Sequence, residues 1–155
     1  MIPNVPFKPM AMYNTSLQSA RAGLVALMMF SGVAHAQEVF KARLSMVPVD
    51  TAMKKTVAGL GTASATLSGN KLSVTGSFDG LLSPATTAHI RLSRVIGVRG
   101  PELLNLTVTA ATSGTLSGSF DLTPPQVESL KKGLFYIQIN SEKAPDGNLW
   151  GWLQH

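Results

Sequence analysis

The residues that could carry out chemistry in this chain of 155 residues are few. The chain has no cysteine, which excludes disulfides, thiolate nucleophiles, thiolate metal sites and lipid attachment to a cysteine. After residue 36 its only histidines are His89 and His155. A Ser-His-Asp arrangement would depend on His89, and no Gly-x-Ser-x-Gly turn is present to expose a serine. We therefore predict that the protein is not an enzyme and has no catalytic residues.

His89 allows two interpretations. Neutral imidazole is a good ligand for copper or zinc, so His89 could hold such a metal weakly together with Asn140, an aspartate or His155. A histidine on the face of a sheet is more commonly hydrogen-bonded to a neighbouring side chain. We predict the second arrangement, with no metal and no cofactor, and keep the weak metal site as the alternative.

Charge is sparse along the chain, with 14% charged residues and a net charge of +5. Adjacent basic residues occur only as Lys54-Lys55 and Lys131-Lys132, with no aromatic residues between them, which argues against a nucleic-acid surface. The acidic residues fall at expected turns and hairpin ends, where solvation accounts for them. The sequence therefore indicates neither a nucleic-acid partner nor a pair of carboxylates for glycoside cleavage.

The N-terminal residues are typical of a signal peptide. Lys8 and Arg21 precede an uncharged stretch at 22–33, and Ala34-His35-Ala36 follows as a cleavage signature. This stretch is shorter than the roughly 20 residues that cross a bilayer. We predict a signal peptide over residues 1–36 and an exported protein, periplasmic or secreted, with no membrane span after cleavage. An uncleaved anchor is the alternative, and Met10 or Met12 could replace Met1 as the start.

Between residues 37 and 155, apolar and polar residues alternate with a period of two, which is typical of strands with one buried face. Ala63, Ala65 and Leu67 alternate with serine and threonine, and Ser68-Gly69-Asn70 is a short hairpin turn to the next alternating segment. The expected strands cover 39–45, 62–68, 71–78, 86–92, 105–110, 116–122, 135–141 and 148–154.

One short helix interrupts the strands. Thr123 and Gln126 form a Thr-x-x-Gln capping box, Pro124 suits the first helical position, and Gly133 ends the helix. We predict one all-β domain over residues 37–155, an antiparallel Greek-key-like β-sandwich of about eight short strands with this helix as a connector.

Several short motifs follow one another in a specific order. They are Phe40-Lys41-Ala42-Arg43-Leu44-Ser45, Gly61-Thr62-Ala63-Ser64-Ala65, Phe78-Asp79-Gly80-Leu81, Ala88-His89-Ile90, Gly133-Leu134-Phe135-Tyr136-Ile137-Gln138-Ile139-Asn140-Ser141 and Pro145-Asp146-Gly147-Asn148. This ordered set resembles the CHRD domain, a family first described in chordin and common in exported bacterial proteins.

The chain departs from that family at two histidines. Relatives often read Ala-His-Ile-His where this chain has Ala88-His89-Ile90-Arg91. They often read Ile-His-Thr where this chain has Ile139-Asn140-Ser141. Three converging imidazoles would resemble a metal site, but a guanidinium has no lone pair to donate. The resemblance implies a binding or structural module, and the loss of these two histidines argues against a metalloprotein.

Strand parity predicts one outward face. In the segments around residues 90 and 138, the apolar positions point inward and the residues between them point outward. Around residue 151, Leu149, Gly151 and Leu153 match the inward positions of the closing strand of the CHRD domain, so the resemblance implies that the two tryptophans point outward. The outward set is His89, Arg91, Tyr136, Gln138, Asn140, Trp150 and Trp152. The two tryptophans stand where relatives tend to carry arginine and glutamine.

This set has two interpretations. It is either an aromatic and polar platform for a protein, a peptide, a carbohydrate or a second copy of the chain, or the tryptophans pack beneath a loop or the connector helix. We predict the platform as the ligand or partner face, with homo-oligomerisation through Trp150 and Trp152 as one use of it. The ligand itself is not indicated.

Overall fold

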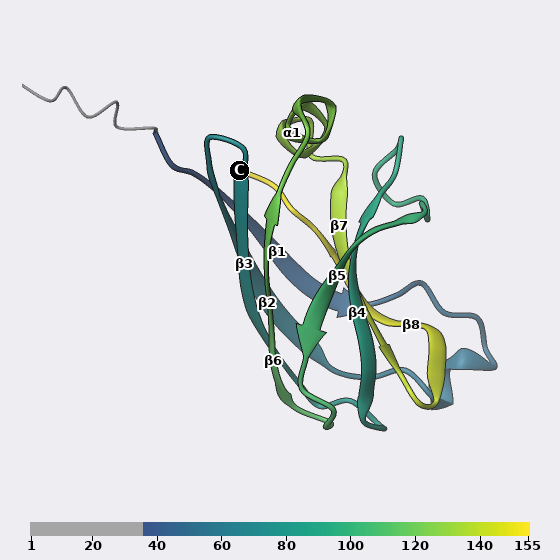
Figure 1. Cartoon of the computed structure of the whole chain (residues 1–155). Coiled ribbons are helices and arrows are strands. Elements are labelled where there is room, and N and C mark those ends of the chain that lie inside the picture. Colours follow the sequence, from purple (N-terminus) through teal and green to yellow (C-terminus); the bar gives the residue numbers. More distant parts are fainter. Residues whose placement is uncertain (1–35) are drawn as a thin grey trace, which may run out of the picture. The chain divides into compact units, whose positions relative to one another are not determined.

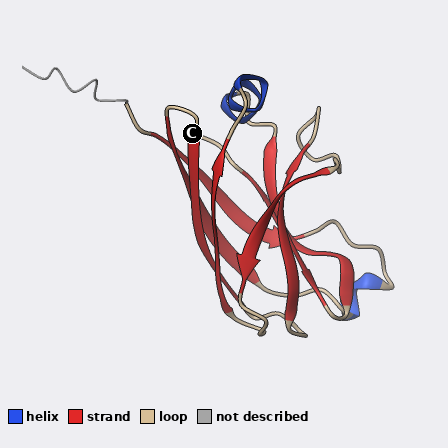
Figure 2. Ribbon diagram, viewed as in Figure 1, coloured by secondary structure: helices blue, strands red, loops and turns tan. Residues whose placement is uncertain are grey.

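The computed structural model describes residues 36–155 (Figure 1). These residues form eight strands, one α-helix and one 3-10 turn, so that Figure 2 is almost entirely strand and loop. The strands are β1 (Glu38–Met46), β2 (Leu60–Ser68), β3 (Lys71–Asp79), β4 (Ala85–Leu92), β5 (Glu102–Val108), β6 (Gly114–Asp121), β7 (Phe135–Ser141) and β8 (Ala144–Trp152). The 3-10 turn η1 (Met53–Lys55) lies between β1 and β2, and α1 (Pro124–Lys131) lies between β6 and β7.

The alternation of the sequence separates a buried face from an outer face. In β2, Ala63, Ala65 and Leu67 are buried, whereas the serine and threonine between them are partly exposed. In β3, Leu72 and Val74 are buried on the same side. The predicted all-β class with a single short helix is confirmed for residues 36–155.

The strands of residues 36–155 pair antiparallel in one closed ring, in the order β1-β2-β3-β6-β5-β4-β7-β8. The predicted sandwich is therefore wrong, because these strands form a barrel. Two strands account for the closure. The body of β1 pairs with β2 while its end, Ser45 and Met46, pairs with β8; β5 pairs first with β4 and then, at Thr107 and Val108, with β6.

β1 and β5 thus pass from one sheet to the other and leave no free edge between the two sheets. Period-two alternation shows which face of a strand is buried, but it does not show which strands meet at the edges of a sheet. The strand order still contains a Greek key. β4, β5 and β6 follow one another in the chain and pair as neighbours, and β6 lies beside β3, the strand that precedes all three.

The helix α1 lies across one end of the barrel (Figure 1). Leu130 is fully buried in the barrel core and Val127 packs against it. The Thr123 N–H donates to Oε1 of Gln126 at 2.9 Å, as the capping box predicts. After the helix, Gly133 has a φ of +70°, a conformation that glycine adopts without steric cost.

Outside the barrel core lies a second, smaller apolar cluster. It consists of Val47, Val57 and Ala144, with Trp150 and Met53 among the partly buried residues packed against it. Because Val47 and Val57 belong to the connection between β1 and β2, that connection folds over the outer side of β8. Two hydrogen bonds hold this connection on β8. The Val47 N–H donates to the Asn148 carbonyl, and Asn148 Nδ2 donates to the Ala58 carbonyl at 2.8 Å.

Two strands begin three or four residues earlier than the alternation predicts. β5 begins at Glu102 instead of residue 105, and β8 begins at Ala144 instead of residue 148. A register shift interrupts the pairing of each of these strands. It lies between Ile90 and Arg91 of β4, opposite β5, and between Ile139 and Ser141 of β7, opposite β8. The alternation with a period of two is lost at both shifts.

Within residues 36–155, no helix has the length and apolar character needed to cross a membrane. The expected signal peptide lies, apart from Ala36, outside the described residues.

Candidate functional site

The seven residues of the predicted face lie together on the outer side of β4, β7 and β8. Two rows run across these strands and continue onto β5. One row is Glu102, Arg91, Tyr136 and Trp152, and the next is Asn105, His89, Gln138 and Trp150. Asn140 lies beside Thr87 one step further along. Strand parity, together with the family resemblance for the two tryptophans, therefore identified side chains that are close neighbours in space.

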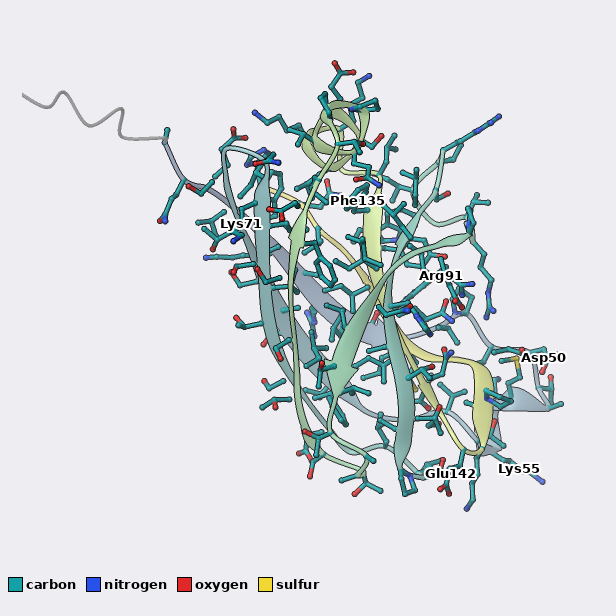
Figure 3. The ribbon with its side chains drawn as sticks, in the orientation of Figure 1. Asp50, Lys55, Lys71, Arg91, Phe135 and Glu142 are labelled. Carbon is teal, nitrogen blue, oxygen red and sulfur yellow. The ribbon has the colours of Figure 1, made fainter. Side chains whose placement is uncertain are left out.

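At the β4–β5 end of the rows, four polar residues contact one another. Nδ1 of His89 lies 3.0 Å from Oδ1 of Asn105 and 3.8 Å from Oε2 of Glu102. Nη2 of Arg91 donates to Oε1 of Glu102 at 3.3 Å. The Glu102 side chain is 49% exposed, against 18% for Arg91 and 13% for His89. This polar cluster opens to solvent at Glu102 and Asn105, and Figure 3 shows Arg91 on the outside of the barrel wall.

At the β7–β8 end, three aromatic rings pack together. The Tyr136 ring contacts both tryptophans, with its centroid 4.5 Å from that of Trp152 and 5.8 Å from that of Trp150. The two tryptophan rings meet edge to face at 6.3 Å. Both tryptophans are half-buried, while Tyr136 is completely buried.

Two of the seven residues are not accessible to solvent. Tyr136 and Gln138 point away from the barrel interior, as parity predicts, but both are fully buried because the β4–β5 loop and the start of β8 cover them. The Gly100 N–H donates to the Tyr136 hydroxyl at 2.9 Å from the β4–β5 loop. Nε2 of Gln138 donates to the Asp146 carbonyl at 3.2 Å, and Arg99 of the same loop donates to that carbonyl as well.

The tryptophans also differ from each other. Trp150 packs beneath the β1–β2 connection, in the small cluster with Val47 and Val57, which fits the interpretation that it lies beneath a loop. Trp152 belongs to neither apolar cluster of the described residues and stacks on Tyr136. The members of the predicted face that are partly exposed and lie outside the small apolar cluster are therefore Trp152, Arg91, His89 and Asn140.

The residues of the alternative metal site are not brought together. Asn140 donates to the Thr87 hydroxyl and accepts from Gln138, while His155 lies against Phe40 and near Glu38. Within residues 36–155, no group of three His, Cys, Asp or Glu side chains is placed to hold a metal ion.

Comparison with known protein families matches residues 24–153 to the CHRD domain. The chain belongs to the CHRD domain family. Neither a curated protein nor a solved structure matches it. The match begins at residue 24, ahead of the described residues, and spans all eight strands of the barrel.

The site of this CHRD domain includes residues that the sequence analysis did not select. Glu102 stands at a position that simple alternation would turn inward, but the irregular pairing opposite Ile90 and Arg91 turns it outward beside Arg91. A charged residue at an inward position is itself a sign of such a bulge. Arg99 lies in a loop without periodicity, and nothing in the sequence links it to Asp146.

The opposite wall of the CHRD barrel carries a different feature. A groove of about 710 Å³ lies over β1, β2 and β3. Its polar lining includes Lys41, Arg43, Thr62, Ser64, Thr75 and Ser77. Two cations and a set of hydroxyl groups give this groove a positive character, whereas the polar cluster on β4 and β5 contains both signs of charge.

Proposed function

We propose that this CHRD domain is an exported, non-catalytic binding module and that its ligand is a carbohydrate held on the outer face of β5, β4, β7 and β8. The contact residues are Arg91 and Glu102 at one end of their row and Trp152 at the other, with His89 and Asn140 beside them. Tyr136 and Gln138 support this surface from beneath, and Trp150 belongs to the structural part of the face.

The main support for the proposal is the environment of the Arg91 side chain. The side chain is 18% exposed, one terminal nitrogen binds Glu102, and its Nε is buried with no hydrogen-bond partner among the described residues. A buried donor without a partner costs free energy, so a turn of the guanidinium that brings this donor to a bound hydroxyl group would recover that loss. Oε1 of Gln138, on the neighbouring strand, is likewise buried without a partner in residues 36–155.

A carbohydrate matches this chemistry best among the classes we consider. Sugar hydroxyls both donate and accept, which suits a surface that offers a guanidinium, a carboxylate, an imidazole and an amide within one small area. The apolar face of a sugar ring can stack on the accessible part of Trp152. A peptide or a second copy of the chain would use the same face through other contacts.

A glycan array probed with the exported form of the protein tests the proposal, followed by titration of any glycan that binds. We expect Arg91→Met and Glu102→Gln each to weaken that binding at least tenfold while the thermal midpoint stays close to that of the parent. The matched controls, Lys71→Met and Glu128→Gln, change the same kinds of residue elsewhere and should leave binding unchanged.

Failure of all glycans to bind, or glycan binding that both site variants retain, contradicts the proposal. Sedimentation and peptide-library screening run alongside distinguish the two other uses of the face. Dimerisation or peptide binding that Arg91→Met abolishes would replace the carbohydrate as the function of this surface.

A further inference from the structure

The loop between β4 and β5 has an apolar tip flanked by arginines. Val95, Ile96 and Val98 are 59%, 54% and 53% exposed, and Arg94 and Arg99 on either side are exposed as well. The loop contains no acidic residue between Leu92 and Glu102. It projects beyond the strands at the end of the barrel where α1 lies (Figure 1).

The tip of this loop has a fixed conformation. The Val98 N–H donates to the Val95 carbonyl at 3.2 Å, and Gly97 between them has a φ of +85°, as the third residue of a type II turn requires. The Ser93 hydroxyl donates to the Val95 carbonyl at 2.8 Å, and the Val95 N–H lies 3.2 Å from that hydroxyl oxygen. The three aliphatic side chains are therefore presented by an ordered turn.

The base of the loop is fastened to the barrel. The Leu92 N–H donates to the Pro101 carbonyl at 3.1 Å, and the Gly100 N–H donates to the Tyr136 hydroxyl. A Cβ on Gly100 would collide with the Leu92 carbonyl oxygen, so the backbones of the two arms of the loop are in close contact at this point. A rigid projection needs little ordering when it binds, which favours binding.

We propose that this tip inserts into the interfacial layer of a membrane that contains anionic phospholipid. Val95, Ile96 and Val98 would leave water for the boundary between headgroups and acyl chains. Arg94 would bind a phosphate group beside them, and Arg99, which also donates to the Asp146 carbonyl, would add positive charge facing the lipid surface. The arrangement of an apolar centre between two cations, without an acid, complements an anionic lipid surface in both polarity and charge.

A second copy of the chain is a poorer partner for this tip. Three aliphatic side chains on a convex turn are far smaller than the roughly 800 Å² per partner that stable protein interfaces bury. The 710 Å³ groove over β1, β2 and β3 is lined by Lys41 and Arg43, which would repel Arg94 and Arg99. A fluid lipid surface imposes no such requirement of shape.

Co-sedimentation of the exported protein with vesicles tests the proposal. We expect binding to vesicles of phosphatidylcholine with 30 to 50% phosphatidylglycerol, roughly the composition range in which surface charge attracts basic residues, and much weaker binding to phosphatidylcholine alone. Val95→Ser with Ile96→Ser should lower the partition coefficient at least tenfold, since each buried methylene contributes about fourfold. Arg94→Gln should lower it about fivefold.

Matched controls separate the tip from general surface properties. Leu60→Ser with Leu82→Ser removes two aliphatic side chains that are 66% and 47% exposed elsewhere on the barrel, and Lys55→Gln removes a cation from η1. Neither control should change vesicle binding. The variant Ile96→Trp should show a blue-shifted emission on anionic vesicles, quenched by brominated lipid.

Three results would overturn the proposal. One is vesicle binding by Val95→Ser with Ile96→Ser equal to that of the parent protein. Another is Ile96→Trp emission that stays unchanged on anionic vesicles. The third is concentration-dependent self-association without lipid that the tip variant abolishes, because the partner would then be a second copy of the chain.

Discussion

Tyr136 and Gln138 illustrate how an outward direction differs from an accessible position. Both side chains lie on the outer side of β7, and both are covered by the β4–β5 loop at Arg99 and Gly100 and by the start of β8 at Asp146. They hold these covering segments against the barrel wall. The chemistry available to a ligand shifts to the neighbours that remain partly open, Arg91 and Trp152 above all.

Replacement of the tryptophans tests this division at the level of single residues. Trp150→Gln should lower the free energy of unfolding by about 3 kcal/mol, because it leaves a polar group and a void among Val47, Val57 and Ala144. Trp152→Gln should cost only about 1 kcal/mol, since it removes stacking on Tyr136 from a partly exposed site. Urea denaturation measures both.

Trp152→Gln is also the sharper functional variant. It should lose glycan binding while the protein remains folded, whereas any loss of binding in Trp150→Gln would accompany loss of structure. Equal losses of stability in the two variants would contradict the assignment of Trp150 to the small apolar cluster.

The sequence predicted the direction in which the side chains of the site point, but it did not predict how deeply they are buried. Parity placed His89, Arg91 and Asn140 on one outer face because the period of two fixes the direction of a side chain within a strand. Burial on that face depends on loops, whose path is set by individual contacts such as that of Gly100 with Tyr136. The prediction of His89 as a hydrogen-bonded sheet residue is confirmed by its contact with Asn105.

Among the elements, α1 shows how local sequence signals and tertiary packing agree. Thr123, Pro124 and Gln126 define where the helix begins, and Leu130 anchors it in the barrel core. The strands that follow a simple alternation, such as β7, have the predicted bounds. β5 and β8 begin early because irregular pairing breaks the period on which the prediction relied.

The variant Gln126→Ala tests the start of α1. It removes the acceptor of the Thr123 N–H and should lower the free energy of unfolding by about 1 kcal/mol. The control Glu128→Ala lies on the same helix, is exposed and does not cap it, and should change stability by less than about 0.5 kcal/mol. Chemical denaturation midpoints compare the two, and equal midpoints would argue against a stabilising capping box.

For the molecule as a whole, the order of strands in the ring was beyond the sequence analysis. Eight alternating segments are compatible with a sandwich or a barrel, because both bury one face of each strand. The difference lies in β1 and β5, each of which pairs on both sides along different parts of its length. Such divided pairing has no signature in residue type or spacing.

The extent of the exported chain is a separate prediction. If residues 1–36 are a signal peptide, the intact mass of the protein recovered from the periplasm or medium should correspond to a chain that begins at Gln37. Mass spectrometry of that fraction measures it. Recovery of a form that retains residues 22–33 would support the uncleaved anchor instead.

The pairing of β1 with β8 has a consequence for the order in which the chain folds. The first and last strands meet at Ser45 with Trp150 and at Met46 with Leu149, contacts that span most of the described sequence. Contacts of such high sequence separation form slowly, and here they require β8 to have been synthesised. A nascent chain that lacks β8 leaves hydrogen-bonding edges on β1 and β7 unpaired. The ring can therefore close only after β8 has been synthesised, so the barrel stays open while the preceding strands are translated.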